Sequence, residues 1–246
     1  MKPDPLRKEF GLSMQRVRDG FIIAFIGMVF SVPQIRYQSP WVYAKFAGRT
    51  GTASEIDQFF IAHLITILSA LLIIVLVGDL ANRRAELVPF KWPGRKNIRP
   101  SVAIGLLFIP ASYFLYDHFL IALMPRIFPD KLGYALLFPF SVTFPDELFV
   151  RFGFLALFAW MLKRFSGGKL MANIFVAGIF SLFSWYGVTR FLSAPLKTME
   201  ILLLLAGTFA ENIVAGGIYF KHGFWSSLAF RVAAALKFPV YFMLFF

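Results

Sequence analysis

Two adjacent carboxylates and an arginine lie in an apolar part of the sequence, in the segment Asp146-Glu147-Leu-Phe-Val-Arg151. Ionisable side chains are costly in such surroundings, so they are functional candidates by default. Glu147 and Arg151 are four residues apart, share one face of a helix and can form a pair. Asp146 lies about 100° round the helix from Glu147 and is free to face a cavity. This pattern suits general acid–base chemistry. The alternative is structural, because carboxylates stabilise a helix N-terminus and an ion pair makes the helix tolerable in lipid.

A second pair of opposite charges lies later in the chain. Glu211, which precedes Asn212, falls midway along one apolar segment, and Arg231 falls within the next. A short turn at Lys221–Gly223 separates the segments, so the two side chains lie at similar depths in an antiparallel helix pair. We predict an ion pair between Glu211 and Arg231 inside the membrane, because pairing neutralises two expensive charges.

Few residues suit other catalytic chemistry. The chain has no Cys, which excludes disulfides and thiolate catalysis, and only three His. His63 and His118 fall in apolar segments, where a lone His is more often a packed side chain than a catalyst. His222 falls in a turn. His118 follows Asp117, but neighbours on a helix point about 100° apart. Zinc sites usually need three or four ligands, and only Asp146 and Glu147 lie together, so we expect no metal and no cofactor.

The composition defines the elements that must position these residues. Of the 246 residues, 59% are hydrophobic and 15% are charged, and the mean hydropathy is +0.70. Soluble domains are about 45–50% apolar and roughly 25% charged, so a soluble enzyme, a disordered protein and a disulfide-rich secreted module are all excluded. We predict an all-α, polytopic integral membrane protein that forms one membrane-embedded domain over residues 1–246.

Seven segments are apolar enough to be candidates for membrane-crossing helices of about 20 residues. Their approximate bounds are Gly20–Ile35, Gln58–Leu80, Val102–Met124, Leu132–Leu162, Leu170–Val188, Met199–Phe220 and Phe224–Phe246. The fourth is too long for one straight crossing, and Pro139 and Pro145 divide it. Because Pro145 fits the first turn of a helix, we predict an interfacial or broken piece followed by a helix from about Phe144 to Arg164.

The net charge of +12 reflects where 25 Lys and Arg lie. Loops on the side of the N-terminus hold roughly twice as many Lys and Arg as the opposite loops, which is the positive-inside pattern. We therefore predict a cytoplasmic N-terminus and an outside C-terminus. The positive charge then serves orientation and attraction to anionic lipid, so the expected partner is the bilayer and not nucleic acid.

Two stretches resemble one known family. Asp146-Glu-Leu-Phe-Val-Arg-Phe-Gly-Phe-Leu155 resembles the first motif, Glu-Glu-x-x-x-Arg, of the CPBP intramembrane proteases, which include CAAX prenyl endopeptidases and bacteriocin-processing proteins. Gly216-Gly-Ile-Tyr-Phe-Lys-His-Gly-Phe-Trp225-Ser-Ser-Leu-Ala is similar to the approach to that family's third motif. The resemblance covers about Leu132–Ala235 and implies a membrane-embedded endopeptidase of the glutamic type. It also implies a location in a prokaryotic plasma (inner) membrane.

The resemblance also implies a catalytic apparatus that this chain lacks in part. In the family, the first Glu and a His of the second motif activate water, and a third motif, His-x-x-x-Asn/Asp, stabilises the oxyanion. Asp146 stands in place of the first Glu, and Ser184 stands where the His of the second motif belongs. Arg231 and Ala235 occupy the His and Asn/Asp positions of the third motif. The site therefore looks degenerate, and Arg231 is a candidate for a structural arginine that closes a former active site.

Three functions remain open from the sequence. The first is an intramembrane endopeptidase, with Asp146 or Glu147 as the base, Arg151 orienting it and a membrane-anchored peptide or protein as substrate. The second is a non-catalytic scaffold or regulator that binds a membrane peptide or partner in the same cavity. The third is a transporter that uses the buried charges as a relay. Loss of oxyanion stabilisation and of proton transfer typically costs orders of magnitude in rate, which favours a weakly active or non-catalytic protein.

Overall fold

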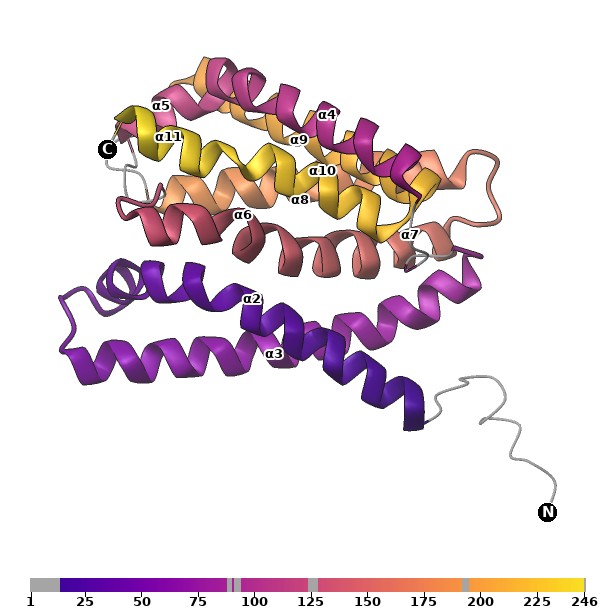
Figure 1. The fold of residues 1–246 in the computed structure, drawn as a ribbon, viewed down its shortest axis with the longest axis horizontal. Coiled ribbons are helices and arrows are strands. Elements are labelled where there is room, and N and C mark those ends of the chain that lie inside the picture. The colour runs from indigo at the N-terminus through magenta and orange to yellow at the C-terminus, as the bar shows by residue number, and fades with distance from the viewer. Residues whose placement is uncertain (1–13, 88–89, 91–93, 124–127, 192–194, 246) are drawn as a thin grey trace.

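The chain folds into a bundle of long helices. The computed structural model describes residues 14–87, 90, 94–123, 128–191 and 195–245, and every regular element in these ranges is helical. Figure 1 shows the helices lying roughly along one common axis, with the beginning of the first described helix and the end of the last one at opposite ends of the bundle. Termini at opposite ends are what an odd number of crossings produces.

The elements follow one another along the chain with short connections. They are α2 (Met14–Ala47), α3 (Ala53–Arg84), α4 (Arg95–Ser112), the π-helix η1 (Tyr113–Asp117), α5 (His118–Leu123), α6 (Leu132–Glu147), the π-helix η3 (Leu148–Leu155), α7 (Ala156–Met161), α8 (Gly168–Phe191), α9 (Thr198–His222), α10 (Phe224–Ala235) and α11 (Lys237–Phe245).

Six helical stretches in the described ranges are long and apolar enough to cross a membrane. They are Arg16–Ala47, Ala53–Arg84, Arg95–Leu123, Gly168–Arg190, Thr198–His222 and Phe224–Phe245. A seventh helix, α6–η3–α7, runs without a break from Leu132 to Met161 and contains three charged residues, Asp146, Glu147 and Arg151. The predicted all-α polytopic membrane fold of about seven helices is confirmed.

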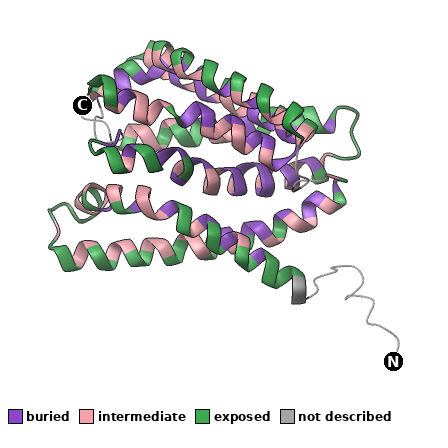
Figure 2. Cartoon of the chain, in the orientation of Figure 1, coloured by how far each residue is buried: buried purple, intermediate pink, exposed green. Residues whose placement is uncertain are grey.

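The bilayer contacts a largely apolar outer surface. Large hydrophobic side chains are exposed on the outward faces of the helices, for example Ile73, Leu107 and Leu170. Figure 2 shows buried residues concentrated along α6 and η3, in the middle of the bundle, and exposed residues on the outlying helices. Exposed apolar side chains of this number fit contact with lipid and not with water.

The predicted break at Pro145 is wrong. Pro139 and Pro145 both lie inside α6, and the helix continues through them. Proline removes a backbone donor, but in membrane helices Ser and Thr side chains and neighbouring helices compensate for the loss. Here Thr143 donates its hydroxyl to the carbonyl of Pro139 instead of capping a new helix. Packing of α6 against α2 and α10 supports the helix that contains both prolines.

The predicted bounds of the first span also differ from the structure. The first span is much longer than Gly20–Ile35, because α2 continues from Met14 to Ala47 through Pro33 and Pro40. The last predicted span corresponds to the helical stretch Phe224–Phe245, in which the single residue Leu236 separates α10 from α11. Pro239 lies in the first turn of α11, the position where a proline is tolerated best.

Close contacts between helices hold the charged centre of the bundle in place. A Cβ on Gly78 of α3 would collide with the carbonyl oxygen of Phe152 in η3, and a Cβ on Gly153 would collide with Ile74. Small residues of this kind let two backbones approach closely in a membrane. The α3–η3 contact therefore fixes η3, which carries Arg151, relative to the rest of the bundle.

Candidate functional site

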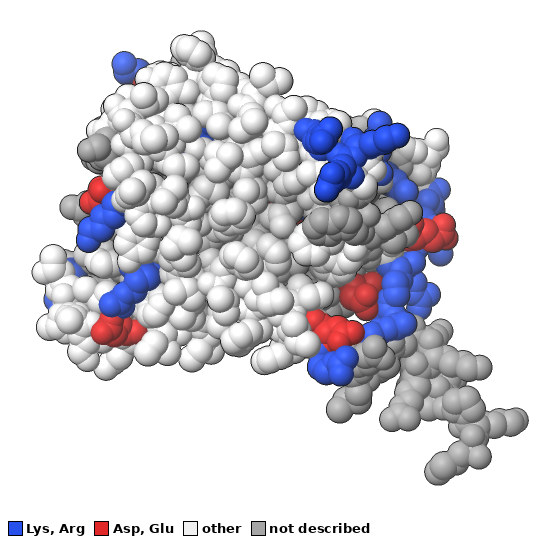
Figure 3. Space-filling view, viewed as in Figure 1, with Lys and Arg blue, Asp and Glu red and all other residues white. Residues whose placement is uncertain are grey.

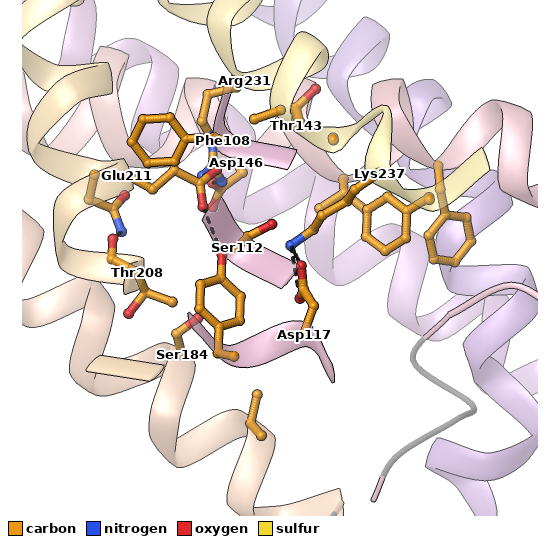
Figure 4. A pocket seen from close by; sticks show the side chains of 18 of the residues that line it. Phe108, Ser112, Asp117, Thr143, Asp146, Ser184, Thr208, Glu211, Arg231 and Lys237 are labelled. Carbon is orange, nitrogen blue, oxygen red and sulfur yellow. Dashed lines mark hydrogen bonds and ion pairs between the residues drawn. The ribbon is translucent and has the colours of Figure 1, made fainter. Parts of the chain in front are cut away.

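A cavity of about 610 Å³ lies inside the bundle, next to the ionisable residues (Figure 4). Its wall is built by helices α2, α4, α5, α6, α8, α9, α10 and α11 and by the π-helices. The polar and ionisable lining residues are Gln34, Gln38, Ser112, Tyr116, Asp117, Thr143, Asp146, Ser184, Thr208, Glu211, Asn212, Arg231 and Lys237. The rest of the wall is mostly aromatic and aliphatic, so the cavity has both a polar and an apolar part.

Arg231 of α10 lies at the centre of the polar part. Its Nη2 is 2.7 Å from Asp146 Oδ2, and its Nη1 donates a hydrogen bond to Glu211. Its Nε lies 3.7 Å from Glu147 Oε1. The structure thus brings Glu211 and Arg231 together, as their depth indicated, and adds Asp146 and Glu147 to the same cluster. The Arg231 guanidinium therefore lies within 4 Å of three carboxylates, those of Asp146 and Glu147 on α6 and of Glu211 on α9.

Glu147 and Arg151 form a buried pair behind the cavity wall. The exposed fraction is 0% for the Glu147 side chain and 1% for Arg151, and Arg151 Nε is 3.5 Å from Glu147 Oε1. Arg151 also donates from Nη2 to Asn212 Oδ1 at 2.7 Å. Asn212 in turn donates to the carbonyl of Thr208 at 2.8 Å, which fixes its orientation. Asp146 is therefore the carboxylate of the first motif that lines the cavity.

A second ion pair, between Asp117 and Lys237, was missed by the sequence reasoning, which considered Asp117 only with His118. Lys237 Nζ is 2.9 and 3.1 Å from the two carboxylate oxygens of Asp117, and Tyr241 donates to the same carboxylate at 3.0 Å. Tyr116 joins the two clusters. Its hydroxyl is 3.4 Å from Glu211 Oε2, and the Lys237 ammonium lies 5.0 Å from its ring centroid.

The three histidines lie away from this site. His118 contacts the backbone carbonyl of Tyr113 through Nδ1 at 2.9 Å and is exposed. His63 packs edge-on against Phe59, and His222 ends α9. The lining of the cavity includes none of them within the described ranges. The described residues also contain no group of three or more His, Cys, Asp or Glu side chains placed to hold a metal ion.

Ser184 of α8 and Ala235 of α10 also line the cavity. The four positions taken from the family motifs, Asp146, Ser184, Arg231 and Ala235, are thus gathered around one space, although they come from three separate helices. The resemblance to the family motifs indicated these positions, through their order and spacing relative to those motifs.

The cavity reaches the outer surface at α8. Phe183 and Ser184 both line it and are exposed, with 64% of Phe183 accessible. In a membrane protein, an opening along the side of a spanning helix faces the lipid. A molecule in the bilayer can therefore approach the cavity from the side.

Comparison with known protein families, with curated proteins and with solved structures gives no match to this chain.

Proposed function

We propose that this protein is a non-catalytic relative of the CPBP intramembrane proteases, which binds a hydrophobic membrane peptide in the central cavity. Arg231, at the position of a family histidine, occupies the space between the carboxylates, and this one observation carries the proposal. The protein then acts as a membrane scaffold or regulator.

The gathering of the motif positions supports the relationship. A chance similarity in Asp146–Leu155 and Gly216–Ala229 gives no reason for Ser184 and Ala235 to line the same cavity as Asp146 and Arg231. Descent from an enzyme whose site was built at these positions gives that reason. The resemblance and the geometry agree on which residues surround the site.

The chemistry of Arg231 argues against hydrolysis. A guanidinium stays protonated and has donors but no acceptor, so it cannot take a proton from water. It also holds Asp146 in an ion pair, with Nη2 2.7 Å from the carboxylate oxygen. Amide hydrolysis needs a base, an acid for the leaving group and oxyanion stabilisation. Arg231 can supply only the last of these.

The cavity supports binding. Its volume of about 610 Å³ lies within the usual range for ligand sites, about 300–1,000 Å³. Aromatic side chains such as Phe108, Phe138 and Phe180 line it, and it opens towards the lipid at Phe183. A hydrophobic segment already in the bilayer can enter without crossing water.

The test uses the purified protein in lipid nanodiscs and fluorescent single-span peptides. We expect saturable binding by energy transfer, and no peptide cleavage above that of empty nanodiscs. Ser184→Trp fills the opening and should weaken binding about tenfold or more, a loss of roughly 1.4 kcal/mol. Met171→Trp, an exposed position on the same helix, is the matched control and should bind like the wild type.

Cleavage by the wild type that is lost in Glu147→Gln would show a working protease and overturn the proposal. Absence of saturable binding for every peptide would also overturn it. Equal loss of binding in Ser184→Trp and Met171→Trp would place the peptide outside the cavity.

A further inference from the structure

We propose that the bound membrane segment presents a single cationic group, a lysine side chain near the bilayer centre, to Asp146. This inference rests on the proposed binding function and specifies the class of segment that binds. It comes from the balance of charges on the cavity wall.

The wall has one more carboxylate than it has cations. Among the described residues that line the cavity, the carboxylates are Asp117, Asp146 and Glu211 and the cations are Arg231 and Lys237. Behind the wall, Glu147 and Arg151 carry opposite charges and add no net charge; Arg151 Nε is 3.5 Å from Glu147 Oε1, and Arg151 Nη1 is 4.0 Å from Asp146 Oδ2. With all of these groups ionised, the empty cavity carries one uncompensated negative charge.

Asp146 is the carboxylate through which a bound molecule can reach this excess. Lys237 contacts both oxygens of Asp117 at 2.9 and 3.1 Å, so that pair is complete. Arg231 is divided between Asp146 and Glu211 and reaches only Oδ2 of Asp146, and Arg151 lies 4.0 Å from the same oxygen. No described residue donates a hydrogen bond to Asp146 Oδ1. The Asp146 side chain is also more exposed than that of Glu211, 36% against 16%.

An uncompensated charge inside a membrane is costly unless a partner neutralises it. Asp146 lies near the middle of the helix that runs from Leu132 to Met161, so its partner must reach the centre of the bilayer. Lysine fits this position, because its apolar stem can lie along the aromatic wall while its ammonium contacts a carboxylate. A neutral segment leaves the charge unbalanced, and an anionic segment adds to it.

The test compares three single-span peptides that differ at one central position, Lys, Leu or Glu, in nanodiscs of uncharged lipid. We expect the Lys peptide to bind about tenfold more tightly than the Leu peptide, and the Glu peptide to bind more weakly than both. The measurement is the apparent dissociation constant from energy transfer between labelled peptide and protein.

Two variants remove the excess charge in different ways. Asp146→Asn keeps an oxygen for Arg231 but loses the charge, and Ser184→Lys adds a cation at an exposed position of the wall. Both should bring the Lys and Leu peptides to equal affinity. Asp19→Asn neutralises an exposed carboxylate at the start of α2 and should keep the tenfold preference. Because Ser184→Lys leaves the buried ion pairs intact, it remains a valid test if Asp146→Asn does not fold.

The outcomes separate the inference from the function on which it rests. Equal binding of all three peptides to the wild type overturns the inference and leaves peptide binding in place. A preference for Lys that survives in Asp146→Asn and Ser184→Lys also overturns it. Failure of every peptide to bind overturns both proposals.

Discussion

At the scale of single residues, Arg231 contacts more of the charged side chains around the cavity than any other described residue. Its guanidinium contacts Asp146 and Glu211 on the cavity wall and lies 3.7 Å from Glu147 behind it. Only 14% of its side chain is exposed. Removing it therefore leaves several carboxylates close together in a medium that solvates them poorly.

We expect Arg231→Ala to destabilise the detergent-solubilised protein by about 3–5 kcal/mol, the usual effect of removing one partner of a buried ion pair. The measurement is the thermal or denaturant midpoint of the purified protein. Arg190→Ala is the matched control, because Arg190 is exposed near the end of α8 and should change the midpoint little. An unchanged midpoint in Arg231→Ala would show that the ion cluster adds nothing to stability.

The two wall ion pairs differ in how far sequence could predict them. Glu211 and Arg231 lie on helices joined by a turn at Gly223, where φ is 82°, a left-handed conformation that glycine adopts readily. The depth of each side chain in the membrane could therefore be estimated by counting residues from the turn. Asp117 and Lys237 come from distant parts of the chain, and no local rule relates their depths. The only signal was that each is an ionisable residue within an apolar segment.

At the scale of elements, the close pairing of α4 with α10 positions Arg231. A Cβ at Gly105 of α4 would collide with the carbonyl oxygen of Phe230 and lie 2.7 Å from the Cβ of Ala233. Both of these residues are close to Arg231 on α10. The backbones meet at this point only because Gly105 has no side chain.

Gly105→Ala should therefore destabilise the protein by about 1–3 kcal/mol, since an added methyl group must push two helices apart. Gly178→Ala on α8 is the matched comparison, because a Cβ there meets nothing within 4 Å. That change should stabilise the protein by about 0.5–1 kcal/mol through better helix propensity. Thermal midpoints of the two variants would check the opposite signs, and equal shifts in one direction would contradict the packing.

A surface contact joins the end of α3 to the loop after α7. Lys163 Nζ is 2.6 Å from Glu86 Oε1 and 3.1 Å from the carbonyl of Arg84. The hydrogen bond from Lys163, together with its charge, lowers the pKa of the Glu86 carboxyl. Stability from this contact is present above the unfolded pKa of about 4.3. It is lost as the pH falls through the lower folded value.

Replacing Glu86 with Gln should lower the melting temperature by no more than a few degrees at pH 7, because the pair is exposed to solvent. The difference from wild type should shrink towards pH 3. Melting curves at both pH values test this, and a difference independent of pH would rule out the charge as its cause. Gln keeps a similar side chain at a residue with a φ of 58°, so backbone strain is unchanged.

The helix α6–η3–α7 could be predicted from the sequence only in part. Its apolar run and its charged centre were evident, but its continuity was not. The rule that places Pro145 at a helix start describes an isolated helix, whereas here the neighbouring helices hold both sides of the proline. The π-helix η3, which contains Arg151, has no local sequence signal.

At the scale of the whole molecule, the charges divide the surface into two ends and an apolar band. Figure 3 shows most Lys and Arg side chains over the end of the bundle where the N-terminus lies, and few elsewhere on the visible face. The basic residues at that end include Arg83, Arg84, Arg95, Lys96, Arg99, Lys163, Arg164, Lys169 and Lys221. The placement of Lys and Arg in alternate loops predicted this separation, and the 59% of hydrophobic residues predicted the apolar band between the two ends.

The orientation of the bundle remains a prediction, and the absence of native Cys makes it straightforward to test. Ser166→Cys lies in the loop after α7 at the basic end, and Thr50→Cys lies between α2 and α3 at the opposite end. Both positions are exposed. In right-side-out vesicles, a membrane-impermeant maleimide should label Thr50→Cys at once, and Ser166→Cys only after permeabilisation. The physical reason is that Lys and Arg in short loops are retained on the cytoplasmic side. The reverse labelling would show that these cations do not set the topology, and the peptide would then meet the cavity in the opposite orientation.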